Sequence, residues 1–160
     1  MTSGVYCLSS DQHRANAILT ALRGAGFSSE ISVLIENHAE SRDISVKEDA
    51  LRGAKFGSVF GALLALTIPG IGPALAVGPL IAMMGGAAAG GVVGGLAGGS
   101  GVLGGVGLPR EVEQRLHQGV ADGDILLSVH TDDPVKLQRA LEIFKAENAE
   151  YIYEERKAAA

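Results

Sequence analysis

The middle third of this sequence lacks charge. From Phe56 to Pro109 it runs 54 residues without Asp, Glu, Lys, Arg or His, and 17 of its 23 glycines lie in that run. A water-facing loop does not have this composition, and a domain core seldom holds so long an uncharged stretch. The run must therefore be covered by lipid, by a partner subunit or by the chain's own domain.

Other absences narrow the function. The single cysteine, Cys7, excludes an intramolecular disulfide framework and fits a buried, unreactive thiol. Residues 1–11 contain no basic start followed by an apolar stretch, so no signal peptide is expected. The net charge is −5 and Lys and Arg are not clustered, which argues against nucleic acid as a partner.

The sequence predicts no catalytic or metal site. Its four histidines fall on different predicted elements, and none has a second His or Cys at metal-ligand spacing: His13, His38, His117 and His130. The densest polar cluster is His130, Asp132 and Asp133, which leaves open a ligand-binding or acid–base role on a sheet face. Asp133 is more simply a helix cap. We expect no enzyme, no cofactor and no metal.

The first polar arm, residues 1–55, predicts a strand, a helix and a second strand. Val5–Ser9 is the first strand, and Ser9 with Gln12 has the capping-box spacing of a helix start. Gly24 and Gly26 end that helix. Ile31–Ile35 follows as a strand rich in β-branched residues. The apolar face of the helix comprises Ala15, Ile18, Leu19 and Leu22.

The second polar arm, residues 110–160, repeats this order. Asp124–His130 is a strongly apolar strand. Asp133 and Pro134 suit a helix start, because Asp accepts an orphan backbone hydrogen bond and Pro fits the first helical position. Glu150–Tyr153 is a closing strand. The buried stripe of the helix is expected to comprise Leu137, Ala140, Leu141 and Phe144.

Two strand–helix–strand units predict an α+β fold, a ferredoxin-like βαββαβ sandwich with its helices on one face. The second and third strands are neighbours in that topology, so a long segment can be inserted between them. We expect residues 1–35 and 124–160 to be the two halves of the domain. Residues 36–123 are then an inserted linker, an apolar glycine-zipper helical hairpin and a return helix. That helix starts at Pro109, ends at Gly123 and packs Val112, Leu116 and Val120 on the domain.

The inserted hairpin is expected to consist of two helices joined by a proline-broken turn over residues 68–79. Ser45 and Glu48 have capping-box spacing for the first helix, and residues 80–99 form the second. Glycine costs about 1 kcal/mol relative to alanine inside a helix, so repeated glycines indicate close backbone packing. The self-association rows, spaced by four, are Gly53, Gly57 and Gly61, then Gly86, Gly90, Gly94 and Gly98.

Two other interpretations of the glycines are weaker. A flexible linker would be polar and rich in Gly and Ser, whereas this run is laced with Val, Leu, Ile, Met and Ala. A phosphate-binding loop would need a Lys followed by Ser or Thr, and none follows these glycines.

The length of the run permits membrane insertion. Residues 80–99 would be about 30 Å long as a helix, which matches a bilayer core, but residues 56–68 reach only about 20 Å. The chain has no tryptophan for an aromatic belt. Our first hypothesis is a non-enzymatic protein that docks on or inserts into the cytoplasmic membrane from the cytoplasmic side and self-associates. The alternative is a soluble structural protein of the cytoplasm that forms a homo-oligomer with its hairpins packed together.

Several segments together resemble a known family. They are Ile31-Ser32-Val33-Leu34, Ile68-Pro69-Gly70-Ile71-Gly72-Pro73, Gly107-Leu108-Pro109, the strand ending in His130-Thr131-Asp132-Asp133, and Ala149-Glu150-Tyr151-Ile152. The chain resembles, over nearly its full length, the bacterial general stress protein 17M-like, or low-temperature-induced, family. The resemblance implies a stress-linked bacterial protein without an established catalytic activity, so it assigns no functional residues.

Overall fold

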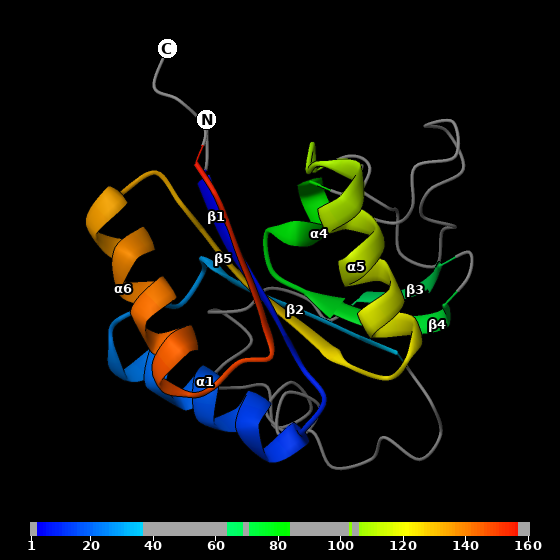
Figure 1. Ribbon diagram of the computed structural model, residues 1–160, viewed down its shortest axis with the longest axis horizontal. Coiled ribbons are helices and arrows are strands. Elements are labelled where there is room, and N and C mark those ends of the chain that lie inside the picture. Colours follow the sequence, from blue (N-terminus) through cyan, green and yellow to red (C-terminus); the bar gives the residue numbers. More distant parts are fainter. Residues whose placement is uncertain (1–2, 37–63, 69–70, 84–102, 104–105, 157–160) are drawn as a thin grey trace.

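A computed structural model describes residues 3–36, 64–68, 71–83, 103 and 106–156 (Figure 1). The described elements are, in chain order, β1 Ser3–Ser9, α1 Gln12–Gly24, β2 Ile31–Glu36, β3 Leu64–Ile68, β4 Gly72–Val77, α4 Leu80–Met83, α5 Arg110–Ala121, β5 Ile125–Thr131, α6 Pro134–Ala146 and β6 Tyr151–Glu155.

The strands form one six-stranded antiparallel sheet in the order β3-β4-β2-β5-β1-β6. Strands β1 and β5 pair over their full lengths, from Ser3 opposite Thr131 to Ser9 opposite Ile125. This register places the start of β1 beside the end of β5, where the polar residues described below lie.

One face of the sheet packs against α1 and α6 (Figure 1). The apolar stripes predicted for these helices are buried there, together with Val5 and Cys7 of β1 and alternate residues of β2 and β5. The sequence therefore predicted this layer correctly, because helical spacing and strand alternation are both legible in the polar arms.

The opposite face packs against α5, which lies across the sheet from α1 and α6 (Figure 1). Val112, Leu116 and Val120 of α5 are buried against Leu8 and Leu126 of the sheet. The predicted packing of this helix on the domain is confirmed. Gly119 makes the close approach possible, since a Cβ there would lie 2.4 Å from Leu8 Cδ1.

The prediction of a ferredoxin-like sandwich with an inserted helical hairpin is wrong, although the fold is α+β. The segment between β2 and β5 contributes two strands, β3 and β4, to the same sheet. It also contributes α5 to the face opposite α1 and α6, so the helices do not share one face. Residues 64–68 and 72–77, expected as helix and turn, are therefore strands.

The caps of α1 and α6 are polar side chains, and one of the predicted caps is wrong. Asp11, not Ser9, caps α1, and its Oδ1 accepts a hydrogen bond from His13 N at 2.9 Å. Ser9 Oγ instead donates to Asp11 O at 2.8 Å. Asp133 caps α6 as predicted, ahead of Pro134. Pro109 occupies the cap position of α5 and not its first helical position, so the helix begins one residue later than expected, at Arg110.

Candidate functional site

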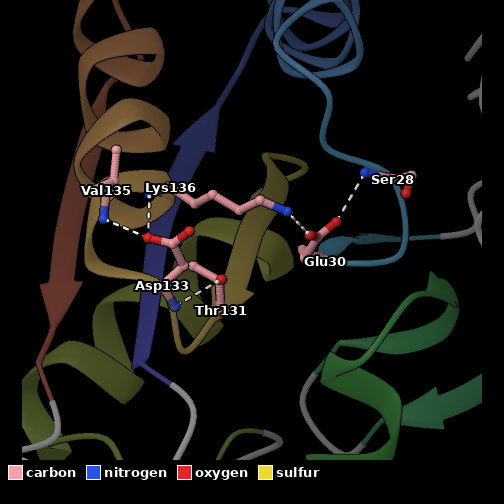
Figure 2. A network of polar contacts seen from close by, with 6 residues as sticks. All are labelled: Ser28, Glu30, Thr131, Asp133, Val135 and Lys136. Carbon is pink, nitrogen blue, oxygen red and sulfur yellow. Dashed lines mark hydrogen bonds and ion pairs between the residues drawn. The ribbon is translucent and has the colours of Figure 1, made fainter.

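The predicted polar cluster His130, Asp132 and Asp133 does not form one site. Asp133 Oδ1 accepts hydrogen bonds from Val135 N at 2.8 Å and Lys136 N at 3.4 Å, so it acts as a helix cap (Figure 2). Asp132 is exposed, whereas His130 is buried within the sheet. The His130 ring contacts Ser128 and Tyr6.

An ion pair joins the start of α6 to the start of β2 (Figure 2). Lys136 Nζ lies 2.6 Å from Glu30 Oε1, and Glu30 Oε2 accepts a hydrogen bond from Ser28 N at 3.0 Å. The hydrogen bond from Lys136 holds the pKa of the Glu30 carboxyl below its usual range. The same bond raises the pKa of Lys136. The pair is partly exposed, and it links the first turn of α6 to the residue that precedes β2.

A second polar group lies inside the sheet face that α5 covers. Ser128 Oγ and His130 Nε2 are 2.9 Å apart, and the His130 ring packs edge-on against Tyr6 with centroids 5.3 Å apart. The Tyr6 hydroxyl donates to Glu155 Oε2 at 3.5 Å. Four strands thus contribute side chains to one polar row, because Ser32, Ser128, Tyr6 and Tyr153 are successive cross-strand neighbours.

Within this buried group, the Tyr6 hydroxyl is the group whose pKa is displaced. Burial raises the pKa of the Tyr6 hydroxyl, and the Glu155 carboxylate beside it raises that pKa further. Tyr6 therefore stays protonated and acts as a hydrogen-bond donor. Tyr6 and Ser128 are fully buried, and His130 and Glu155 are at most 9 % exposed, so substrate has no access to the group in this conformation. A structural role explains the arrangement better than catalysis does.

The polar row also fastens part of the uncharged run to the sheet. Leu80, the first residue of α4, donates its backbone N–H to Ser32 Oγ at 2.9 Å. Leu80 is itself buried among the apolar residues beneath α5. The run is thus partly covered by the chain's own domain.

Cys7 lies on the opposite sheet face and is fully buried. Burial raises the pKa of its thiol, which keeps the thiolate unavailable at neutral pH. This agrees with the buried, unreactive thiol expected from the sequence.

The two edges of the sheet differ in charge. The edge strand β6 carries Glu154 and Glu155, and Glu154 Oε1 lies 2.5 Å from Nε of the following Arg156. The other edge strand, β3, has the sequence LALTI, without charge or proline. Within the described part of the chain, β3 pairs with β4 on one side and with no strand on the other. Charge normally protects such edges from pairing with other chains.

The predicted self-association rows, Gly53, Gly57, Gly61, Gly86, Gly90, Gly94 and Gly98, lie outside the described residues. Ser128, Tyr6 and Glu155 were not singled out from the sequence. Alternation along β5 places Ser128 and His130 on one face, which is a usable signal. The placement of Tyr6 and Glu155 beside them depends on strand pairing, which the sequence does not specify.

No protein-family model, no curated protein and no solved structure matches this chain. Among the described residues, no helix has the length and apolar character needed to cross a membrane. The same residues contain no group of three or more His, Cys, Asp or Glu side chains placed to hold a metal ion.

Proposed function

We propose that this chain is a non-enzymatic protein that self-associates through its uncharged run. The observation that carries the proposal is the contrast between the sheet edges: β6 is charged, whereas β3 offers an uncharged, proline-free strand. A second copy can add its own β3 to this edge by main-chain hydrogen bonding. Antiparallel pairing of two identical strands generates a two-fold symmetric dimer, the commonest kind of homo-oligomer.

The glycine rows extend this proposal beyond the sheet. Gly53, Gly57, Gly61 and the row from Gly86 to Gly98 give small-residue faces on which further contacts between copies can form. The stress-associated role implied by the family resemblance belongs to the same proposal.

The test of self-association is a lysine on the uncharged edge. Thr67→Lys places a charge on β3, and natural edge strands use lysine to prevent pairing. By size-exclusion chromatography with light scattering, we expect the unaltered protein to be dimeric or larger and Thr67→Lys to dissociate. Val135→Lys is the matched control, because Val135 is 76 % exposed on α6, and it should keep the wild-type mass. A monomeric unaltered protein would contradict the proposal.

We further propose that assembly takes place at the cytoplasmic side of the cytoplasmic membrane, because the 54 uncharged residues are flanked by Lys55 and Arg110. Cell fractionation followed by a carbonate wash separates this from assembly in the cytoplasm. Recovery in the membrane fraction after the wash is the expected result. Complete recovery in the soluble fraction, without detergent, would contradict the membrane location but would not contradict self-association.

A further inference from the structure

Strand β3 lies at one end of the described sheet, and the hydrogen bonding of the sheet determines which of its main-chain groups face outward. In an antiparallel ladder, one residue directs its N–H and C=O to the strand on one side, and the next residue directs both to the other side. The N–H of His130 donates to the carbonyl oxygen of Glu30, the residue before β2, at 2.9 Å. The main chain of His130 therefore faces β2, and so does that of Ser128, which lies opposite Ser32.

The same alternation can be followed across β2 and β4 to the edge. Because the main chain of Ser32 faces β5, that of Val33 faces β4, where Val33 lies opposite Val77. The main chain of Val77 in turn faces β2, so that of Ala76 faces β3, opposite Leu64. Every second residue of β3, beginning with Leu64, therefore bonds to β4, and the residues between them direct their main-chain groups outward.

The residues of β3 with outward main-chain groups are Ala65 and Thr67. Pro73 of β4 supports this assignment, because it lies opposite Thr67 and has no N–H to give in a hydrogen-bonded pair. Within the part of the sheet that the structure describes, no strand lies on the outward side of β3. The edge thus presents the N–H and C=O groups of two residues, spaced for pairing with another strand.

We propose that a second copy of the chain pairs with β3 in one antiparallel register, with the Leu66 residues of the two copies opposite each other. This inference rests on the proposed self-association and defines its geometry. In this register Ala65 of each copy lies opposite Thr67 of the other. Both pairs are hydrogen-bonded pairs of two bonds each, so all outward groups of Ala65 and Thr67 are used. A two-fold axis beside Ala65 or Thr67 would use only one such pair within the strand.

The charges of the two sheet edges favour a second β3 over the β6 edge of another copy. β6 carries Glu154 and Glu155, and β3 has no basic residue to pair with them. Pairing of β3 with β6 would also be head-to-tail, which leads to open fibres unless the rotation closes a ring. Pairing of two β3 strands closes the assembly. It leaves the charged β6 strands at the two ends of the joined sheet, where charge opposes further pairing.

The experiment is disulfide cross-linking of the full chain with Leu66→Cys, Ala65→Cys or Thr67→Cys. Opposed residues of a non-hydrogen-bonded antiparallel pair have Cα atoms about 4.5 Å apart, which a disulfide can span. On oxidation, Leu66→Cys should form a covalent dimer at least about tenfold faster than either other variant alone. An equimolar mixture of Ala65→Cys and Thr67→Cys should cross-link faster than either of them, because the register places these positions opposite each other. Val135→Cys, exposed on α6, is the control for random collision.

Light scattering of the unaltered protein separates this proposal from the self-association on which it rests. A monomer would contradict both. A dimer or larger assembly in which Ala65→Cys or Thr67→Cys alone cross-links fastest would overturn the register and leave self-association in place. An assembly in which all three β3 variants cross-link no faster than Val135→Cys would have the same consequence, since the copies would then meet elsewhere.

Hydrogen exchange of the unaltered protein provides a second test if a cysteine variant does not fold. The Thr67 amide should exchange at least about tenfold more slowly in the assembly than after dilution to the monomer, because the second copy accepts its hydrogen bond. The Leu66 amide is the control: it bonds to β4 in both states and should change less. Equal protection of the Thr67 amide in the two states would overturn the proposal.

Discussion

Gly4 of β1 lies directly opposite His130 of β5, and a Cβ on residue 4 would lie 3.1 Å from His130 Nδ1. The same Cβ would lie 2.9 Å from Cε2 and 3.0 Å from the hydroxyl of Tyr6. The missing side chain at Gly4 is therefore what lets the Tyr6 and His130 rings pack over the strand.

Gly4→Ala should lower the free energy of unfolding by about 1–3 kcal/mol, because both rings are buried and have little room to move. Urea unfolding followed by circular dichroism measures the change. Gly24→Ala is the control: a Cβ there meets nothing within 4 Å, so that variant should be neutral or slightly stabilising. Equal stabilities of the two variants would mean that the buried polar row tolerates displacement.

Capping and catalysis make different predictions for the residues after His130. Asp133→Ala should cost about 1 kcal/mol of stability, because the first turn of α6 loses its side-chain acceptor. Asp132→Ala, at an exposed neighbour, should change stability by less than about 0.5 kcal/mol. Thermal or urea unfolding of the two variants compares them directly. A larger effect at Asp132 would show that the polar segment has a role beyond the helix cap.

The Glu30–Lys136 pair should make the free energy of unfolding rise with pH in the acid range. The folded-state pKa of Glu30 is lowered, so the unfolded chain binds more protons in this range and stability rises with pH. The contribution is present above the unfolded pKa of about 4.3 and is lost as pH falls through the lowered folded pKa. Lys136→Met should therefore flatten the dependence of stability on pH below about pH 5. Arg139→Met, which breaks an exposed pair with Glu142, should leave that dependence unchanged.

At alkaline pH the same ion pair makes stability fall, not rise, as pH increases. The folded-state pKa of Lys136 is raised, so its contribution is complete below the unfolded pKa of about 10.4 and is lost as pH rises through the folded value. Urea unfolding above pH 10 should show a fall in stability that Glu30→Gln reduces. A parallel fall in both proteins would assign it to other groups.

The polar arms were predictable because their signals are local. Helix stripes such as Leu137, Ala140 and Phe144 repeat at helical spacing, and Asp133 with Pro134 marks a helix start without reference to the rest of the chain. The cap of α1 was misplaced by two residues because Ser9 and Asp11 are both good capping residues, and only the backbone geometry selects Asp11.

Strands β3 and β4 were not predictable by the same means. Their Leu, Ala, Ile and Val residues lack the polar positions that distinguish a period of two from a period of 3.6. Pairing with β2 decides the matter, and pairing is non-local. The polar row could not be predicted from the sequence for a related reason. Alternation along β5 relates Ser128 to His130, but only the strand register brings Tyr6 beside them.

The glycine rows yield a prediction that rests on the sequence alone. If Gly86, Gly90, Gly94 and Gly98 form a packing face, Gly90→Val should hold the opposing surface away and weaken assembly by about 1–3 kcal/mol. Gly101→Val, beyond the row, should have a smaller effect. Light scattering across a dilution series measures the midpoint of dissociation for each variant. If valine has the same small effect at both positions, the glycine row is not a packing face, and the interpretation as a flexible linker is favoured.

Substitutions at Gly72 and Gly78 distinguish the cost of backbone strain from the cost of steric conflict. Both residues have φ +94, but their surroundings differ. A Cβ at Gly72 meets nothing within 4 Å, whereas one at Gly78 would lie 2.2 Å from Ile31 O and 2.7 Å from Ser32 Cα. Gly72→Ala should therefore cost about 1–2 kcal/mol, the strain of a left-handed conformation. Gly78→Ala should cost about 1–3 kcal/mol more, because β2 backbone atoms cannot move aside easily.

Urea unfolding of the two variants supplies the difference, and hydrogen exchange at the Leu80 amide shows where it arises. Leu80 N–H donates to Ser32 Oγ, next to the site of the Gly78 conflict, so its protection should fall in Gly78→Ala and persist in Gly72→Ala. Such a result would mean that Gly78 allows the uncharged run to close onto β2. Equal costs, with protection at Leu80 unchanged in both, would mean that residue 78 can move away from β2 without loss of the Leu80 hydrogen bond.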